Sequence, residues 1–326
     1  MSLDLSALNN LRTQTPISFN APLAGLTTFG IGGPALALVT VDEESELRDV
    51  LALSQQFKWP VFVLGGGSNV LFDDRGFPGV VLKLGVGFAS VRAIGRSILA
   101  GAAVSAKMVA KLAKANDLSG LEPLVGLPGT IGGAVKLNAG GRLGAIGEVV
   151  KRIRVMAVDG TIRDYGREVI RYEYRHLDLD LEGGIIIEVE LSLKPEEPRR
   201  ISSNIEKSLD LRLSQPKGMS AGCVFKNPQK LASGLGDLIY QKEPIDETPP
   251  LSAGQMIDLC GFKGRKIGGA MVSLEHANFI VNVGGARAAD VVALIAEIRQ
   301  GVFSRFGLEL ETEIVTPFRL AEENGG

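Results

Sequence analysis

The chain has 326 residues, 45% of them hydrophobic and 22% charged, so it is long enough for two or three domains with large cores. The formal net charge is −2, so the sequence shows no excess of basic residues of the kind that binds nucleic acid. No apolar run approaches the roughly 20 residues that span a bilayer. Two cysteines and two histidines argue against a disulfide framework and against a His-rich metal centre. Because the N-terminus has no signal-peptide pattern, we expect a cytoplasmic protein. From the histidine count and the lack of a long apolar run we expect no metal and no membrane partner.

Hydrophobic periodicity and turn signals predict the following elements in chain order. They are a helix over 43–57, strands over 61–64 and 80–84, and a helix that opens at Ser105 with Met108, Val109 and Leu112 on one face and closes near Gly120. A hairpin joins 153–157 to 161–165 through Asp159-Gly160, followed by a strand over 185–193, a helix over 202–213, a strand over 279–283 and a helix over 290–306 that Gly307 ends. Strands and helices mix without regular βαβ alternation, which favours an α+β fold.

Two stretches depart from this pattern. The proline-bounded turn at 195–198 is the best candidate for a domain boundary. Residues 229–252 combine Gly, Pro and acidic side chains, and we expect them to form an insertion or a mobile loop.

Two glycine-rich runs are the most informative features of the chain: Leu64-Gly65-Gly66-Gly67-Ser68-Asn69-Val70-Leu71 and Gly126-Leu127-Pro128-Gly129-Thr130-Ile131-Gly132-Gly133-Ala134. A bare backbone of this kind can lie against a ligand and aim N–H groups at it. Neither run matches a Walker loop, and neither fits the dinucleotide fingerprint well. A single run would be read as an ordinary tight turn. Two runs, each next to a strand, favour a large phosphate-bearing cofactor.

Further segments complete the pattern: Thr28-Phe29-Gly30-Ile31-Gly32-Gly33-Pro34, Tyr174-Arg175, Ser220-Ala221-Gly222-Cys223-Val224-Phe225-Lys226-Asn227-Pro228, 261–264 with 267–270, His276-Ala277-Asn278-Phe279-Ile280-Val281-Asn282 and Leu310-Glu311-Thr312-Glu313-Ile314. Taken together, and covering roughly residues 20 to 316, they resemble the UDP-N-acetylenolpyruvoylglucosamine reductase family of bacterial cell-wall synthesis. The glycine runs alone resemble the wider superfamily of vanillyl-alcohol-type FAD proteins. The segments around 223 and 276–282 are far more specific.

The resemblance implies an α+β protein with an FAD-binding fold of the vanillyl-alcohol-oxidase type in two subdomains, 1–84 and 85–200, and a C-terminal substrate-binding domain, 201–326. It implies noncovalent FAD, NADPH as hydride donor and a UDP-sugar substrate, with no obligate protein partner. FAD binding then falls to Gly65, Gly66, Gly67, Ser68, Asn69, Gly126, Pro128, Gly129, Thr130, Gly132, Gly133 and Asn138. The short segment after Tyr174-Arg175 resembles the family subtype without an extra substrate-covering loop, although 229–252 is longer than that subtype suggests.

The resemblance also implies the catalytic residues Arg175, Cys223 and Glu313. Arg175 and Glu313 would activate the substrate carboxylate and the enolic intermediate, and position 223, commonly serine in the family, would donate the proton. Lys226 and Asn227 are the expected substrate contacts, and the choice among Lys263, Arg265 and Lys266 for the diphosphate stays open. 

Without the resemblance each catalytic candidate has a plainer interpretation. Arg175 lies among Glu173 and Asp178 and would be a surface ion-pair residue, while Glu313 continues an alternating acidic pattern with Glu309 and Glu311. Cys223 would be a small buried hydrophobe, as we expect of Cys260, and His276 a local hydrogen-bonding residue.

Two alternative functions remain at this stage. An FAD oxidase of the wider superfamily would pass electrons to oxygen and would not need Arg175. A non-catalytic paralogue would bind flavin or UDP-sugar without NADPH turnover.

Overall fold

The computed structural model describes residues 6–11, 13–141, 143–213, 215–228 and 251–318, which fall into two compact units. Unit 1 contains residues 1–21, 34–67 and 77–213, and unit 2 contains 22–33, 68–76 and 214–326. The stretch expected to form an insertion, 229–252, lies outside the described residues except for its last two. The elements are α-helices and mainly antiparallel sheets, as an α+β fold requires.

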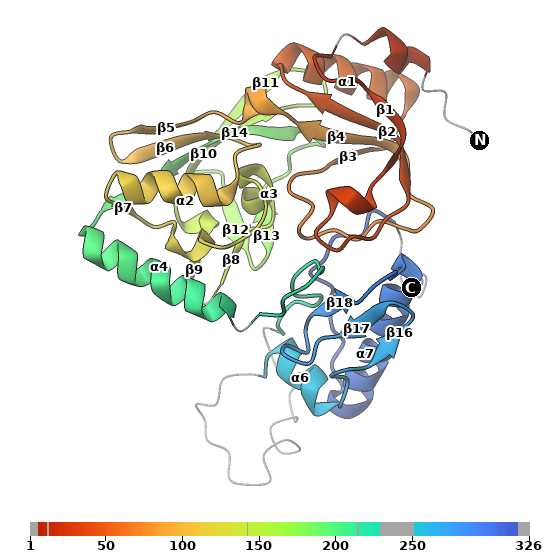
Figure 1. Cartoon of the computed structure of the whole chain (residues 1–326). Helices are drawn as coiled ribbons and strands as arrows, with labels where there is room; N and C mark the ends of the chain where they lie inside the picture. Colours follow the sequence, from red (N-terminus) through yellow and green to blue (C-terminus); the bar gives the residue numbers. More distant parts are fainter. Residues whose placement is uncertain (1–5, 12, 142, 214, 229–250, 319–326) are drawn as a thin grey trace. The chain divides into compact units, whose positions relative to one another are not determined.

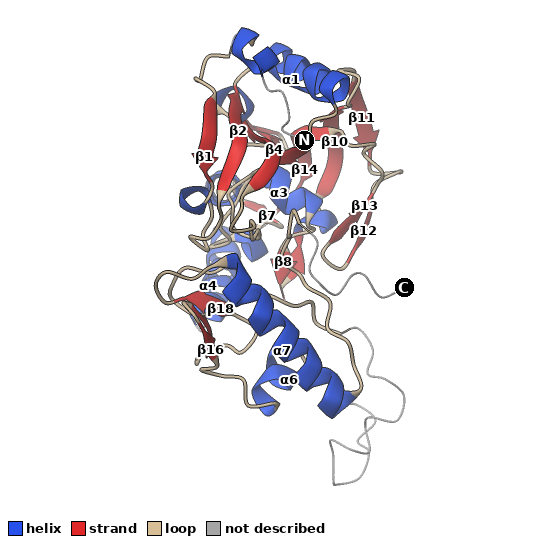
Figure 2. Ribbon diagram, turned by 90° about the vertical axis from the view of Figure 1, so that its right-hand side faces the viewer, coloured by secondary structure: helices blue, strands red, loops and turns tan. Residues whose placement is uncertain are grey.

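The first sheet of unit 1 has the order β1-β2-β4-β3, with β1 Ser18–Pro22, β2 Pro34–Val41, β4 Phe77–Leu84 and β3 Val61–Val63. β2 and β3 both pair with β4 in parallel. Helix α1 (Glu44–Phe57) covers one face of this sheet, as Figures 1 and 2 show. The face is apolar because alternate strand residues meet one side of the helix: Ala37, Val39, Val41, Val80 and Leu82 pack with Leu47, Val50 and Leu51.

The second sheet of unit 1 is antiparallel, in the order β11-β10-β14-β6-β5. Its strands are β11 Ile162–Gly166, β10 Val150–Met156, β14 Ile185–Ser192, β6 Ser97–Gly101 and β5 Val91–Ile94. The predicted hairpin is confirmed, with Met156 opposite Ile162 across Asp159-Gly160. Helices α2 (Ala106–Ala115) and α3 (Ile131–Lys136) pack into the core of this sheet.

Helix α2 begins as predicted, because the Ser105 hydroxyl accepts a hydrogen bond from the Met108 N–H at 3.3 Å. Two details differ from the prediction. The helix ends at Ala115, well before Gly120, because Asn116 and Asp117 leave the helical path, Asp117 with a φ of 53°. Met108, expected on the apolar face with Val109, is 52% exposed, so the buried stripe is formed by the small side chains of the helix.

Unit 1 also contains short paired segments and a long helix. The pairs are β12 (Arg171–Glu173) with β13 (His176–Asp178), β7 (Leu118–Ser119) with β15 (Lys194–Pro195), and β8 (Gly140–Gly141) with β9 (Gly144–Ala145). Helix α4 (Pro198–Leu213), predicted from residue 202, packs on the short 3-10 helix η4 (Glu122–Leu124). The change of unit thus falls after Leu213, one helix beyond the turn at 195–198. The remaining 3-10 helices are η1 Ser6–Asn10, η2 Ala24–Leu26, η3 Val86–Phe88 and η5 Ile146–Glu148.

Unit 2 is built on the antiparallel sheet β16 (Lys266–Ile267), β17 (Ala270–Val272) and β18 (Ile280–Asn282), with helices α6 (Ala253–Leu259) and α7 (Ala288–Phe306). The helix predicted over 290–306 is confirmed and ends at Gly307, whose φ is 62°. Phe29, Ile31 and Leu71, from the two early segments of the unit, are buried in the same core as α7. Among the described residues no helix is long and apolar enough to cross a bilayer.

Candidate active site

The two glycine runs meet within unit 1. A Cβ atom added to Gly66 would lie 2.6 Å from Gly129 Cα, and one added to Gly65 would lie 2.7 Å from Thr130 Oγ1. Real Cβ contacts are not this short, so the two loops can approach each other only because these positions carry no side chain. Segments separated by more than sixty residues in the chain therefore form one backbone-lined surface.

Backbone hydrogen bonds tie the second run to the segment that joins β6 to α2 and to the first residue of α2. The Gly132 N–H donates to Ala102 O at 2.9 Å, the Ile131 N–H to Val104 O at 2.8 Å, and the Ala106 N–H to Gly129 O at 3.1 Å. Gly129 has a φ of 118°, a conformation that an L side chain rarely adopts. The run is thus held in one shape before any ligand arrives, and a bare, fixed backbone is what a long phosphate-bearing cofactor such as FAD requires.

The first run continues into unit 2 with Ser68 and Asn69. The Asn69 side-chain amide donates to Glu313 O at 3.1 Å, and the Leu71 N–H donates to Val315 O at 3.0 Å. Asn69, expected to bind the cofactor, therefore also holds the backbone of the segment that carries a candidate catalytic residue.

Cys223 and Glu313 lie on neighbouring segments of unit 2. The Glu313 N–H donates to Val224 O at 2.7 Å, and the Lys226 N–H donates to Glu311 O at 2.9 Å. On its other side the 223–225 segment pairs with Phe279, through a bridge at Cys223. The structure thus brings together two of the three predicted catalytic residues.

Burial distinguishes Glu313 from the other acidic residues of its segment. Glu309 and Glu311 are exposed, and Glu311 forms an ion pair with Lys226 at 3.0 Å, whereas Glu313 is half-buried. The segment makes only isolated bridges at Thr312 and Val315, so the three carboxylates do not share one solvated strand face.

Arg175 lies in unit 1, at the tip of the β12–β13 hairpin. Its φ is 59°, and a non-glycine residue in this region costs on the order of 1 kcal/mol. Its guanidinium carbon is 5.1 Å from the centre of the Tyr174 ring. Strained backbone of this kind is concentrated at functional sites, which supports a role for Arg175 beyond a surface ion pair.

Asn138 fixes the position of this hairpin. Its side-chain amide donates to Glu173 O at 2.9 Å, and its Oδ1 accepts from the Gly147 N–H at 3.1 Å. Asn138 was expected to bind the cofactor; its side chain is engaged with the backbone on both sides, next to the end of α3.

Sequence reasoning missed Arg212, near the end of α4. Its Nε donates to Val125 O at 2.8 Å and its Nη2 to Pro123 O at 3.1 Å, directly before the second glycine run. A Cβ atom on Gly126 would lie 2.7 Å from Arg212 Cδ. Burial, and secondly the positive charge of Arg175, lower the pKa of Arg212, so the two guanidinium groups are close enough to interact. Arg212 is one of three arginines on a polar helix, and nothing in the sequence distinguished it from the other two.

The cations proposed to contact the substrate have different surroundings. Lys263 pairs with Asp258 at 2.6 Å, and Arg265 pairs with Glu297 at 2.8 Å. Lys266 forms no ion pair with any residue that the structure describes. The Asn227 side chain accepts a hydrogen bond from the Ala253 N–H at 3.1 Å, at the start of α6.

His276 forms the local hydrogen bond expected of it, whereas Cys260, expected to be a small buried hydrophobe, is only half-buried. His276 Nδ1 accepts from the Asn278 N–H at 3.3 Å, and its ring meets Phe279 edge-on. Cys260 is half-buried after α6, and burial raises the pKa of its thiol. The described residues contain no cluster of three His, Cys, Asp or Glu side chains suited to a metal ion.

Comparison with known proteins places these features in a family. Residues 35–166 match the model of the FAD binding domain, and residues 215–316 match that of the UDP-N-acetylenolpyruvoylglucosamine reductase C-terminal domain. The chain is 38% identical to the UDP-N-acetylenolpyruvoylglucosamine reductase of Heliobacterium modesticaldum, over 94% of this chain and 90% of the relative, and 37% identical to that of Moorella thermoacetica, over 96% and 98%.

A solved structure agrees. The crystal structure of the reductase from Thermus caldophilus matches with a TM-score of 0.76 at 36% identity, covering 94% of this chain and 99% of that one. With its paired glycine runs and its Cys223 and Glu313 segments, the chain belongs to the UDP-N-acetylenolpyruvoylglucosamine reductase family, the FAD-dependent oxidoreductases of peptidoglycan precursor synthesis.

Proposed function

We propose that the protein uses NADPH to reduce UDP-N-acetylglucosamine enolpyruvate to UDP-N-acetylmuramate in the cytoplasm, without an obligate protein partner. The observation that carries this proposal is the pairing of the Cys223 and Glu313 segments, joined by the 2.7 Å hydrogen bond from Glu313 N–H to Val224 O. This pairing places Cys223, whose thiol can carry a proton, and Glu313, whose carboxyl is half-buried, on adjacent backbone segments. When bound, FAD would take up hydride from NADPH and pass it to the enol double bond.

The protein's first task is to stabilise negative charge. Hydride addition to one alkene carbon delocalises charge into the neighbouring carboxylate, so a cation or hydrogen-bond donor at that carboxylate lowers the barrier. We assign this role to Arg175 as the cation and to Glu313 as a hydrogen-bond donor, a role that the Glu313 carboxyl can fill only in its protonated form. Arg175 supplies a planar guanidinium that can bind a carboxylate with two parallel hydrogen bonds.

The second task is to protonate the other carbon, which we assign to Cys223. An ordinary thiol titrates near 8.5, so at neutral pH it is mostly protonated and is a stronger acid than a serine hydroxyl. The bridge to Phe279 on one side and the Glu313 segment on the other hold the backbone at Cys223 in place.

Binding of the UDP-sugar would fall to unit 2. Lys226 and Asn227 lie three and four residues after the proposed proton donor, and Lys266 is an exposed cation with no ion-pair partner among the described residues. We favour Lys266 over Lys263 and Arg265 for the diphosphate, because those two would first have to give up a carboxylate. Lys226 would likewise have to leave Glu311 to contact the substrate. We propose that residues 1–84 and 85–200 bind FAD and that residues 201–326 bind the substrate.

Anaerobic mixing tests this function. The flavin-loaded protein should lose its oxidised flavin absorption band on addition of NADPH and recover it only when the enolpyruvyl substrate follows. Rapid recovery on exposure to air alone would favour an FAD oxidase, and no bleaching by NADPH would favour a non-catalytic flavin-binding protein.

A further inference from the structure

Unit 1 contains a second concave surface, next to the β12–β13 hairpin. This cleft has a volume of about 510 Å³, within the range of small-molecule sites. Residues that line it include Asn138, Glu148, Arg167, Arg171 and Tyr172. Asn138 is also one of the residues expected to bind FAD, whereas the other four belong neither to the glycine runs nor to the proposed catalytic residues.

Tyr172 is an unusual feature of the cleft. Its hydroxyl oxygen is buried and has no hydrogen-bond partner among the described residues. The ring is held in place by close packing, because a Cβ atom on Gly147 would lie 2.6 Å from Tyr172 Cδ2. A buried hydroxyl without a partner costs about 1–3 kcal/mol, and an anion bound beside it would accept its hydrogen bond.

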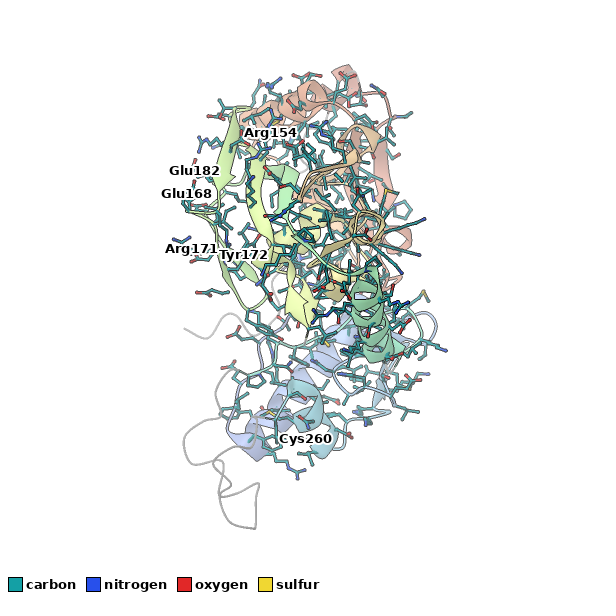
Figure 3. All side chains as sticks on the ribbon, turned by 90° about the vertical axis from the view of Figure 1, so that its left-hand side faces the viewer. Arg154, Glu168, Arg171, Tyr172, Glu182 and Cys260 are labelled. Atoms are coloured by element: carbon teal, nitrogen blue, oxygen red, sulfur yellow. The ribbon has the colours of Figure 1, made fainter. Side chains whose placement is uncertain are left out.

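Two arginines line the same cleft as Tyr172. Burial raises the pKa of the Tyr172 phenol while the charge of Arg167 opposes the rise, which places the Arg167 guanidinium within electrostatic reach of the phenol. Arg171, the residue before Tyr172, donates only to Ile170 O, at 3.0 Å. Neither arginine forms an ion pair with any described residue. Figure 3 shows Arg171 and Tyr172 on the same stretch of hairpin.

The remaining polar groups of the cleft are already engaged. Asn138 bonds to the Gly147 N–H and to Glu173 O, and Glu148 Oε1 accepts from the Ala145 N–H at 2.9 Å. Glu148 Oε2 is left as one acceptor, and the donors left for a ligand are two guanidinium groups and one phenol, so cations outnumber the carboxylate in the lining.

We propose that this cleft is a binding site for a phosphate monoester, separate from the flavin and UDP-sugar sites. Three donor groups match the three terminal oxygens of a phosphate better than the two oxygens of a carboxylate, and guanidinium groups bind phosphate with paired hydrogen bonds. The volume leaves room for an organic group on the phosphate. Asn138 lies past the C-terminal end of α3, whereas the two glycine runs meet at Thr130, at its N-terminal end.

Calorimetric titration of the flavin-loaded protein at constant ionic strength tests the site, with inorganic phosphate and phenyl phosphate as probes and acetate as the comparison anion. We expect saturable one-to-one binding of both phosphates, tighter for phenyl phosphate because the cleft has room for its ring; weaker binding of phenyl phosphate would contradict a monoester ligand. Arg167→Gln should weaken binding at least tenfold, and Tyr172→Phe about fivefold or more. Arg163→Gln is the matched control and should leave affinity unchanged, because Arg163 is already paired with Glu182 at 2.8 Å.

Three results would overturn the proposal. Equal binding of acetate would mean a nonspecific anion surface, and binding seen only after removal of FAD would assign the cleft to the flavin site. Unchanged phosphate affinity in Tyr172→Phe and Arg167→Gln would leave an adventitious ion only. Flavin content and NADPH-dependent bleaching of the flavin are measured for each variant as well. They test the proposed function, so its failure can be told apart from failure of the phosphate site.

Discussion

Gly66 lies so close to Gly129 that a single added carbon on Gly66 would stand 2.6 Å from the Gly129 Cα. The neighbour here is backbone, which cannot move aside as the end of a flexible side chain can. Gly66→Ala must therefore separate the two runs or strain them, at a cost of about 1–3 kcal/mol.

We expect Gly66→Ala to be purified with much less FAD than the wild type, because the two runs form one surface only in contact. Flavin content per chain and the thermal midpoint with added FAD measure this. Gly25→Ala is the control, since nothing lies within 4 Å of its added carbon. Full flavin occupancy in Gly66→Ala would mean that the contact between the runs is not needed for the cofactor.

Arg175→Lys should keep the charge but lose most of the activity, on the order of 10²-fold in kcat/KM. A lysine cannot reproduce the paired hydrogen bonds of a guanidinium, and a small misplacement in an active site has effects of this size. Steady-state kinetics with the enolpyruvyl substrate measure it. Arg265→Lys, which changes an exposed pair with Glu297, should be close to normal. Near-normal turnover of Arg175→Lys would reduce Arg175 to a surface residue.

Substitutions at Cys223 separate the two half-reactions. Cys223→Ser should remain active, whereas Cys223→Ala should allow NADPH to reduce the flavin but slow its reoxidation by substrate by about 10²-fold or more, the usual contribution of a positioned acid. Stopped-flow absorbance of the flavin band follows both steps. Reoxidation of the Ala variant at the wild-type rate would show that the proton comes from another source, such as bound water.

The same position predicts a pH effect. The wild type should lose activity at lower alkaline pH than Cys223→Ser, because a thiol becomes thiolate where a serine hydroxyl stays protonated. Profiles of kcat/KM against pH for the two proteins measure this difference. Superimposable alkaline limbs would contradict the donor assignment.

Glu190 links stability to pH. A hydrogen bond from Lys151 Nζ, at 2.7 Å, holds the pKa of the Glu190 carboxyl below its usual value, with burial acting in the opposite direction. A lowered folded-state pKa contributes stability above the ordinary value, near 4.3, and this contribution is lost as pH falls through the folded-state pKa. Glu190→Gln should lower the thermal midpoint at pH 7 by about 1–4 °C and by much less near pH 3.

Melting curves of Glu190→Gln at pH 7 and pH 3 measure this difference. Glu206→Gln is the control, because Glu206 is an exposed carboxylate on α4. A loss of equal size at pH 7 and pH 3 in Glu190→Gln would mean that packing, not charge, accounts for the effect.

Sequence patterns that span a few residues predicted much of the secondary structure. They could not predict contacts between segments that lie far apart in the chain. The long helices and the Asp159-Gly160 hairpin follow from periodicity and turn chemistry, which act within a few residues. Met108 was placed on the wrong face of α2 because the small alanines of that helix, not its largest side chain, fit against the sheet. Helical spacing alone does not distinguish the two.

The candidate site shows the same division. The motifs named Cys223 and Glu313 through resemblance, but the half-burial that separates Glu313 from Glu309 and Glu311 depends on pairing with a segment ninety residues earlier. Arg212 was missed because its partners, Val125 O and Pro123 O, are backbone atoms that any residue would supply. The left-handed backbone of Arg175 was not predicted either, since nothing in its side chain favours that conformation.

The discontinuous composition of unit 2 has a consequence for synthesis on the ribosome. Phe29, Ile31 and Leu71 leave the exit tunnel early, yet the core that buries them is completed by α7, close to the other end of the chain. These side chains stay exposed to solvent or chaperones while more than two hundred further residues are made. Unit 1 can collapse before α7 is made, but unit 2 can close only once α7 has emerged.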